Sequence, residues 1–102
     1  MKTLAQVRFH LNAGEFDLSE HAFRRAVERN ISEREIREAG AGATVVEEYP
    51  EDKYGPTWLV LGFSEAGRPL HIQISVADSP QLRIVTLYEP SIAEWQDYRR
   101  RV

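Results

Sequence analysis

Apolar residues recur at helical spacing in three stretches of the first forty residues. The first stretch ends at Gly14, a residue type that readily takes the left-handed backbone that stops a helix. The second follows Ser19, which has the character of an N-cap. The third begins at Ser32 with Glu35 three residues later, the pattern of a capping box. These signals predict helices over residues 2–12, 20–29 and 33–39.

Beyond Gly42 the pattern changes to that of β-strands. Residues 57–63 are an almost unbroken apolar run, which indicates a central strand, and residues 69–76 alternate apolar positions with polar ones such as His71. After Pro90, Ser91 and Glu94 repeat the capping-box pattern and predict a C-terminal helix over about 92–100. The predicted strands cover residues 43–49, 57–63, 69–76 and 82–88, and their short connections indicate an antiparallel meander.

Helices that precede the strands, instead of alternating with them, predict the α+β fold class. The expected architecture packs the N-terminal helices on a four-stranded antiparallel sheet and adds the C-terminal helix. The chain of 102 residues shows no repeat and no linker, which fits one domain over residues 1–102.

The composition excludes several kinds of chemistry. Because there is no cysteine, disulfides, thiolate nucleophiles and cysteine metal sites are absent. The histidines at positions 10, 21 and 71 lack the short spacing of metal ligands, so we expect no metal and no cofactor. With neither a membrane-length apolar run nor a signal-peptide pattern, the sequence predicts a cytoplasmic protein that does not associate with membranes.

The formal net charge of −3 is unevenly distributed. Residues 31–52 carry two arginines against seven acidic residues, a balance of 2 − 7 = −5, so the rest of the chain is slightly basic. The mild overall acidity argues weakly against binding nucleic acid through bulk charge, and we expect no binding of DNA by the chain itself. The uneven distribution leaves room for a local basic patch.

His21, Arg25 and Arg29 are spaced four apart and form one stripe of the second predicted helix. One interpretation is an acid/base histidine beside two phosphate-binding guanidinium groups, since arginine binds phosphate in a bidentate way. The other is that His21 is packed and that the arginines pair with acidic neighbours such as Glu20 and Glu28.

His71 occupies a polar position of its strand, and the following hairpin brings it near Thr86 and Tyr88. Together with Arg68, these residues could form a proton-transfer and phosphate site, because RNA cleavage requires deprotonation of a 2′-hydroxyl and neutralisation of charge on phosphorus. The alternative is a half-exposed strand histidine that hydrogen-bonds its neighbours. From the residues alone, both interpretations stay open.

Three further features have both a structural and a functional interpretation. The arginines at 99–101 complement a helix C-terminus, or contact RNA. Trp58 and Phe63 belong to an apolar strand, where aromatic residues are usually core, although they could stack on bases. The acidic residues at 47–52 are expected to form a solvated face or a surface for a basic partner.

The order of short motifs along the chain resembles a bacterial family known as domain of unknown function 4258. The resemblance rests on Leu18-Ser19-Glu20-His21-Ala22, Arg25-Ala26, Glu28-Arg29-Asn30-Ile31-Ser32, Tyr49-Pro50, Gly62, Gly67-Arg68-Pro69-Leu70-His71, Ile84-Val85-Thr86-Leu87-Tyr88-Glu89-Pro90 and Trp95. Members are often encoded beside a zinc-finger antitoxin of the MqsA type, which implies a toxin role in a type II toxin–antitoxin pair.

The family is also distantly similar to RelE-like and BrnT-like ribonuclease toxins. This likeness implies a RelE/barnase-like architecture and a metal-independent endoribonuclease that acts on messenger RNA, free or on the ribosome. The implied catalytic residues are His21, His71 and Tyr88, and the implied substrate-binding residues are Arg25, Arg29, Arg68 and Thr86. The alternative function is a non-catalytic, toxin-derived domain that binds a protein partner through a sheet edge or through the acidic segment 47–52.

Overall fold

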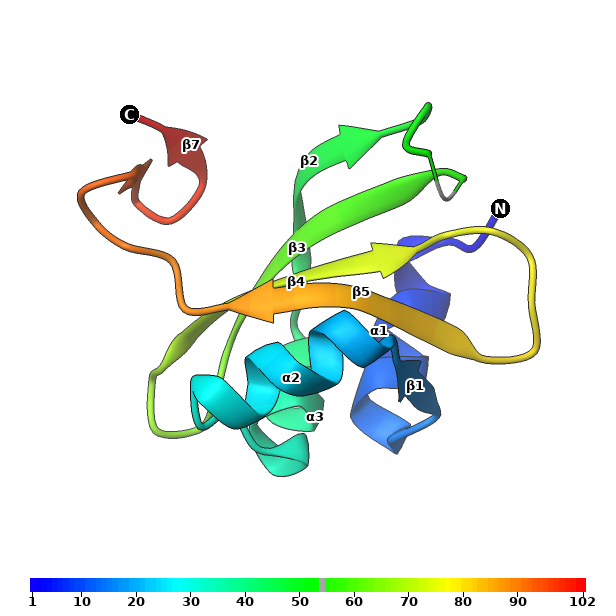
Figure 1. The fold of residues 1–102 in the computed structure, drawn as a ribbon, viewed down its shortest axis with the longest axis horizontal. Helices are drawn as coiled ribbons and strands as arrows, with labels where there is room; N and C mark the ends of the chain where they lie inside the picture. The colour runs from blue at the N-terminus through cyan, green and yellow to red at the C-terminus, as the bar shows by residue number, and fades with distance from the viewer. Residues whose placement is uncertain (54) are drawn as a thin grey trace.

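The computed structural model describes residues 1–53 and 55–102, which form three helices packed against a five-stranded sheet (Figure 1). The helices are α1 (Leu4–Ala13), α2 (Glu20–Glu28) and α3 (Glu33–Ala41). The strands of the sheet are β1 (Phe16–Leu18), β2 (Thr44–Tyr49), β3 (Thr57–Phe63), β4 (Pro69–Ser75) and β5 (Leu82–Tyr88). The predicted α+β class is therefore confirmed.

The helices begin at capping residues, because a side-chain oxygen there satisfies a backbone N–H that the helix leaves unpaired. Ser19 accepts from the backbone N–H of Ala22 at the start of α2, and Ser32 and Glu35 form the expected capping box at the start of α3. α1 ends at Gly14, whose φ of 76° lies in the left-handed region.

The order of strands in the sheet is β1-β5-β4-β3-β2. The strands from β2 to β5 pair antiparallel, as expected for a meander, whereas β1 pairs parallel with β5 at the edge. The expected four-stranded sheet is thus corrected to five strands. β1 has three residues, too few to show the alternation of apolar and polar positions that marks a strand. Its partner strand, β5, lies more than sixty positions further along the chain, so no local sequence pattern reveals β1.

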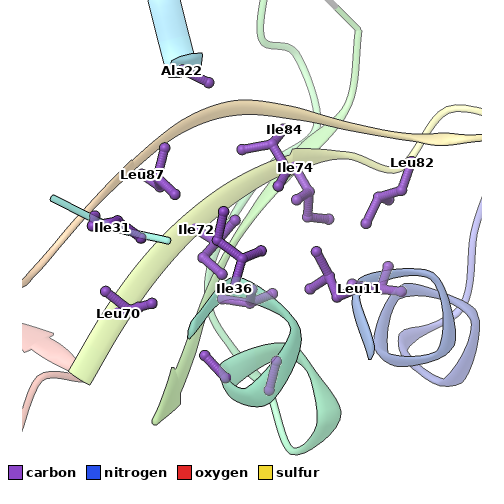
Figure 2. Packing of buried hydrophobic residues seen from close by; sticks show 14 of the residues in the cluster. Leu11, Ala22, Ile31, Ile36, Leu70, Ile72, Ile74, Leu82, Ile84 and Leu87 are labelled. Atoms are coloured by element: carbon purple, nitrogen blue, oxygen red, sulfur yellow. The ribbon is translucent and has the colours of Figure 1, made fainter. Parts of the chain in front are cut away.

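The hydrophobic core lies between the helices and the face of the sheet that we call the inner face. Alternate residues of β4 point into it, and Figure 2 shows Ile72 and Ile74 among Ile36 of α3 and Leu11 of α1. Gly62 of β3 allows the backbone of α3 to approach the sheet closely, because a Cβ at this position would stand 2.0 Å from the carbonyl oxygen of Ala39 in α3. The glycine in the apolar run therefore sets the helix-to-sheet distance.

The predicted C-terminal helix is wrong. Residues 91–102, which we call the strap, instead fold back as a tight hairpin of β6 (Trp95–Gln96) and β7 (Arg100–Arg101) (Figure 1). One turn does form, with the backbone N–H of Trp95 bonded to the carbonyl of Ser91, but Asp97 and Tyr98 then adopt φ of 53° and 62°. Tertiary contacts of the strap with the sheet override the local helix signal.

Among the described residues, no helix is long and apolar enough to cross a membrane. In the same part of the chain, no group of three or more histidine or acidic side chains is placed to hold a metal ion.

Candidate functional site

The strap covers the face of the sheet opposite α1 and α3, which we call the outer face. The register places Leu61, His71 and Tyr88 side by side across β3, β4 and β5 on this face. Trp95 of the strap is buried against them, with its ring centroid 4.5 Å from that of His71. As a result His71 is fully buried, although its strand alternates in the way expected of a half-exposed one.

Both nitrogens of the His71 ring are engaged. Nε2 lies 2.6 Å from the carbonyl oxygen of Tyr98, and Nδ1 lies 3.1 Å from the phenol oxygen of Tyr88. Because a carbonyl can only accept, Nε2 must carry the hydrogen, and Nδ1 of the neutral ring is then the acceptor for the Tyr88 hydroxyl. The strap backbone thus selects the tautomer in which His71 can take a proton from Tyr88.

Burial holds this pair in its neutral state. It lowers the pKa of His71 from its ordinary value, and the bond to the Tyr98 carbonyl and the charge of Glu47 oppose this only in part. Burial also raises the pKa of the Tyr88 phenol. At neutral pH the pair is therefore an uncharged imidazole acceptor and a protonated phenol donor, joined by a hydrogen bond.

A second group of side chains forms the rim of this site. Arg101 of the strap binds Glu47 of β2 through two hydrogen bonds of 3.0 and 3.1 Å, and its guanidinium lies 4.6 Å above the Trp95 ring. The Tyr49 hydroxyl also donates to Glu47. The hydrogen bonds from Arg101 lower the pKa of Glu47, and burial together with the Glu47 carboxylate raises the pKa of Tyr49. We call Glu47, Tyr49, His71, Tyr88, Tyr98 and Arg101 the outer-face cluster.

Beyond the cluster, the outer face continues toward the loop that joins β2 and β3. Gln73 donates to Asp52 and to the Thr57 hydroxyl at 3.1 and 3.0 Å, and the predicted site residue Thr86 lies directly across from it on β5. A shallow hollow opens here, lined by Glu48, Tyr49, Pro50, Glu51, Asp52, Gln73 and Arg101. This approach to the cluster is therefore acidic.

Arg68 belongs to a different arrangement. Its guanidinium binds Glu89 at 2.7 Å, Glu35 at 3.2 Å and the backbone carbonyls of Arg29 and Asn30 at 2.9 Å each. The hydrogen bond to Glu89 is the largest cause of its raised pKa. These contacts join the start of β4 to α3, to the end of α2 and to the chain beyond β5, so in this conformation the donors that were expected to bind phosphate are engaged in holding the fold.

Among the described residues, the predicted stripe on α2 makes no side-chain hydrogen bond, ion pair or ring contact with the side chains of the outer-face cluster. Arg25 pairs with Glu28 at 2.6 Å, and Arg29 donates to the carbonyl of Leu87 at 3.2 Å. His21 is exposed and lines a separate hollow with Arg24, Ser75 and Arg83. Of the predicted catalytic residues, the structure brings together only His71 and Tyr88.

The sequence does not associate four members of the cluster with His71. It groups Glu47 with an acidic segment expected to be solvated or to bind a basic partner, and it places Tyr98 on a helix that does not form. It offers Arg101 as a charge at the end of that helix or as an RNA contact. The signal available for Glu47 and Tyr49 was their shared strand parity, which sends both side chains to one face. A β-bulge between Val45 and Glu47 breaks the alternation before these two residues, so counting from the start of the strand does not give their face.

These features define the chain as an α+β domain whose sheet carries a buried histidine–tyrosine pair on the face away from its helices. Residues 18–89 match the family model described as Domain of unknown function (DUF4258), and the chain belongs to this family, as its motifs predicted. No curated protein and no solved structure matches it. The match includes His71 and Tyr88 but ends before the strap.

Proposed function

We propose that this protein is a metal-independent endoribonuclease that acts on messenger RNA, as the toxin-like component of a bacterial type II toxin–antitoxin system. The observation that carries the proposal is the hydrogen bond between Tyr88 and the neutral, buried His71, with the guanidinium of Arg101 on the same face. A protonated donor, an uncharged acceptor and a cation are the groups that cleavage through a 2′-hydroxyl requires.

In the proposed reaction, the substrate meets Tyr88 and not His71, because the imidazole is fully buried. The 2′-oxygen forms a bond to phosphorus and the bond from phosphorus to the 5′-oxygen breaks. The 2′-proton passes to the Tyr88 oxygen as the Tyr88 proton moves to Nδ1 of His71, and the leaving 5′-oxygen takes a proton from water. Arg101, which is exposed, turns from Glu47 to the phosphoryl oxygens.

Helices α1 and α3 on one face of a largely antiparallel sheet, with the site on the other face, support the proposed RelE-like architecture. The partners that go with this proposal are RNA or the ribosome and a cognate antitoxin of the zinc-finger MqsA type, in the cytoplasm. The remaining predicted residues, His21, Arg25, Arg29, Arg68 and Thr86, keep their assignments as predictions. The contacts of Arg68 oppose a direct role in binding phosphate in this conformation.

A second candidate function is a non-catalytic domain that binds a protein partner. It is favoured by the dispersal of the family's polar residues, since Arg68 and Arg29 are engaged with the fold and His21 lies in its own hollow. An apolar hollow between β1, α2 and α3, beside the exposed Phe23 and Val27, would serve such a partner.

The test is cleavage of a messenger RNA by the full chain in the presence of EDTA, with new ends mapped by primer extension. Tyr88→Phe removes one oxygen and keeps the ring beside His71, so we expect a loss of about 10²- to 10⁴-fold in rate. Phe23→Ala, on the exposed side of α2, is the matched control and should cleave normally. The products should be a 2′,3′-cyclic phosphate and a 5′-hydroxyl.

Cleavage that requires a divalent ion, or that is unchanged in Tyr88→Phe, would contradict this mechanism. If the folded wild type leaves RNA intact in the absence of any antitoxin, the non-catalytic domain becomes the better proposal. In that case, loss of partner binding in Phe23→Ala would locate the interface on α2.

A further inference from the structure

Phe63 is a large apolar side chain on the outer face that is exposed to solvent. It ends β3 on the same face as Leu61, yet 47% of its surface is exposed, whereas Leu61 is buried. Its partner in the apolar run, Trp58, packs against the core, as is usual for such a strand. Sequence reasoning gave Phe63 and Trp58 the same core assignment, and the structure separates them.

An aromatic ring from the strap lies beside Phe63. The ring of Tyr98 meets that of Phe63 edge to face, with centroids 6.1 Å apart. The carbonyl of the same Tyr98 accepts the hydrogen bond from His71. This aromatic pair therefore adjoins the buried histidine that supports Tyr88.

Positive charge gathers at the same place. Arg99 donates to the hydroxyl of Thr44, a residue paired across the sheet with Leu61. Arg100 is exposed on β7, and Arg101 follows it at the rim of the outer-face cluster. The three arginines of the strap outnumber its two acidic residues, Glu94 and Asp97. Single-stranded nucleic acids bind at aromatic side chains beside basic residues, and here an exposed Phe63 and a half-buried Tyr98 adjoin the basic strap.

Two approaches to Tyr88 along the outer face present different side chains. The approach from the β2–β3 loop passes Glu48, Glu51 and Asp52, which repel phosphate. The approach from the end of β3 passes Phe63, Tyr98 and Arg99. Of these two, the strap side is the one that offers RNA an aromatic ring and a cation, and a third hollow, beside α2, adds Arg24 and Arg83.

We propose that Phe63 and Tyr98 form a stacking platform for unpaired bases of single-stranded RNA, with Arg99 and Arg100 binding the adjoining phosphates. The proposal rests on the proposed function, because it assigns the part of the substrate next to the reacting phosphate. Stacking requires unpaired bases and tolerates any sequence, so the platform selects single strands over duplexes.

The test is the binding of the full chain to a short fluorescein-labelled 2′-O-methyl oligoribonucleotide, followed by fluorescence anisotropy. The 2′-O-methyl group blocks attack, so binding is measured without cleavage. Phe63→Ala should weaken binding about 5- to 150-fold, the range measured for the loss of one base–aromatic stack. Phe63→Leu keeps an apolar side chain but no π-face and should weaken binding similarly, whereas Phe63→Trp should retain it.

Two further variants complete the design. Phe9→Ala removes a similarly exposed aromatic ring (62%) from α1, away from the outer face, and should bind as the wild type does. Arg100→Ala should reduce the dependence of binding on salt, by roughly 0.7 in the slope of log affinity against log salt for one phosphate contact on a single strand.

The outcomes separate this proposal from the nuclease. Full binding by Phe63→Leu, tighter binding of a duplex, or no binding by the folded wild type would each overturn the platform. Cleavage of natural RNA with an unchanged KM in Phe63→Ala would also overturn the platform while leaving the nuclease intact. The predicted losses of binding without any cleavage of natural RNA would support the platform and exclude the nuclease.

Discussion

Acid should weaken the fold through His71. The imidazole is buried without charge, and burial lowers its pKa in the folded protein, while the unfolded chain takes up a proton with the ordinary pKa of about 6.5. Below that pH the unfolded state binds one proton more than the folded state at this residue. Stability is therefore fully present above about pH 6.5 and falls as the pH drops from there toward the lower folded pKa.

The size of the effect follows from the one proton involved. Each pH unit in which only the unfolded chain is protonated costs about 1.4 kcal/mol in the free energy of unfolding. His71→Gln removes the titrating group and keeps an amide that can donate to Tyr98 and accept from Tyr88. We expect the variant to be less stable than the wild type by about 1 to 3 kcal/mol in the free energy of unfolding, because its two hydrogen bonds are imperfect. We also expect its free energy of unfolding to depend less steeply on pH.

The assay is urea unfolding between about pH 5 and 8, followed by circular dichroism, with the slope of stability against pH compared between wild type and variant. His21→Gln is the matched control, because it makes the same substitution at a histidine that is exposed to solvent and lies outside the strap. Equal slopes for wild type and His71→Gln would refute the reasoning, whatever the offset between them.

Two other predictions concern residues that hold the helices and the sheet together. Gly62→Ala should destabilise the fold by about 1 to 3 kcal/mol or more in thermal unfolding, because the new Cβ would meet α3 backbone, whereas Gly42→Ala has open space and should change stability by less than about 1 kcal/mol. Arg68→Ala should cost about 2 kcal/mol, since it leaves two carboxylates and two carbonyls of a half-buried network without their donor; Arg34→Ala breaks one exposed pair and should cost at most about 0.5 kcal/mol. A neutral Gly62→Ala, or an Arg68→Ala as mild as Arg34→Ala, would contradict these assignments.

The parts of the fold that could be predicted from the sequence are those whose causes are local. Ser19 and Ser32 mark the starts of α2 and α3 because a cap is settled within four residues. The strap could not be predicted this way. Ser91 starts the turn that its sequence suggests, but burial of Trp95 against His71 and the pairing of Arg101 with Glu47 then determine the path of the chain. Those partners lie more than twenty residues away.

The residues of the site also differ in how far the sequence predicts them, according to whether the cause of their position is local. His71 and Tyr88 could be placed on neighbouring strands from the sequence because one short hairpin joins those strands, whereas their common face depends on a register shift at Val85 that a strict alternation does not predict. Tyr98 could not, since it acts through its backbone carbonyl, and a carbonyl carries no sequence signal. Arg68 shows the opposite case, because its residue type suggests phosphate binding while all three nitrogens of its guanidinium donate to partners within the fold.

The strap determines what the pair of His71 and Tyr88 can do. β4 supplies the imidazole and β5 the phenol, but without a cover the pair would be solvated and His71 would be free to adopt either tautomer. Tyr98 fixes the hydrogen on Nε2, and Trp95 excludes water from the ring. Both residues lie outside residues 18–89, so the matched family region provides the reacting groups and the segment beyond it provides their environment. The pair is therefore completed only when the C-terminal twelve residues fold onto the sheet.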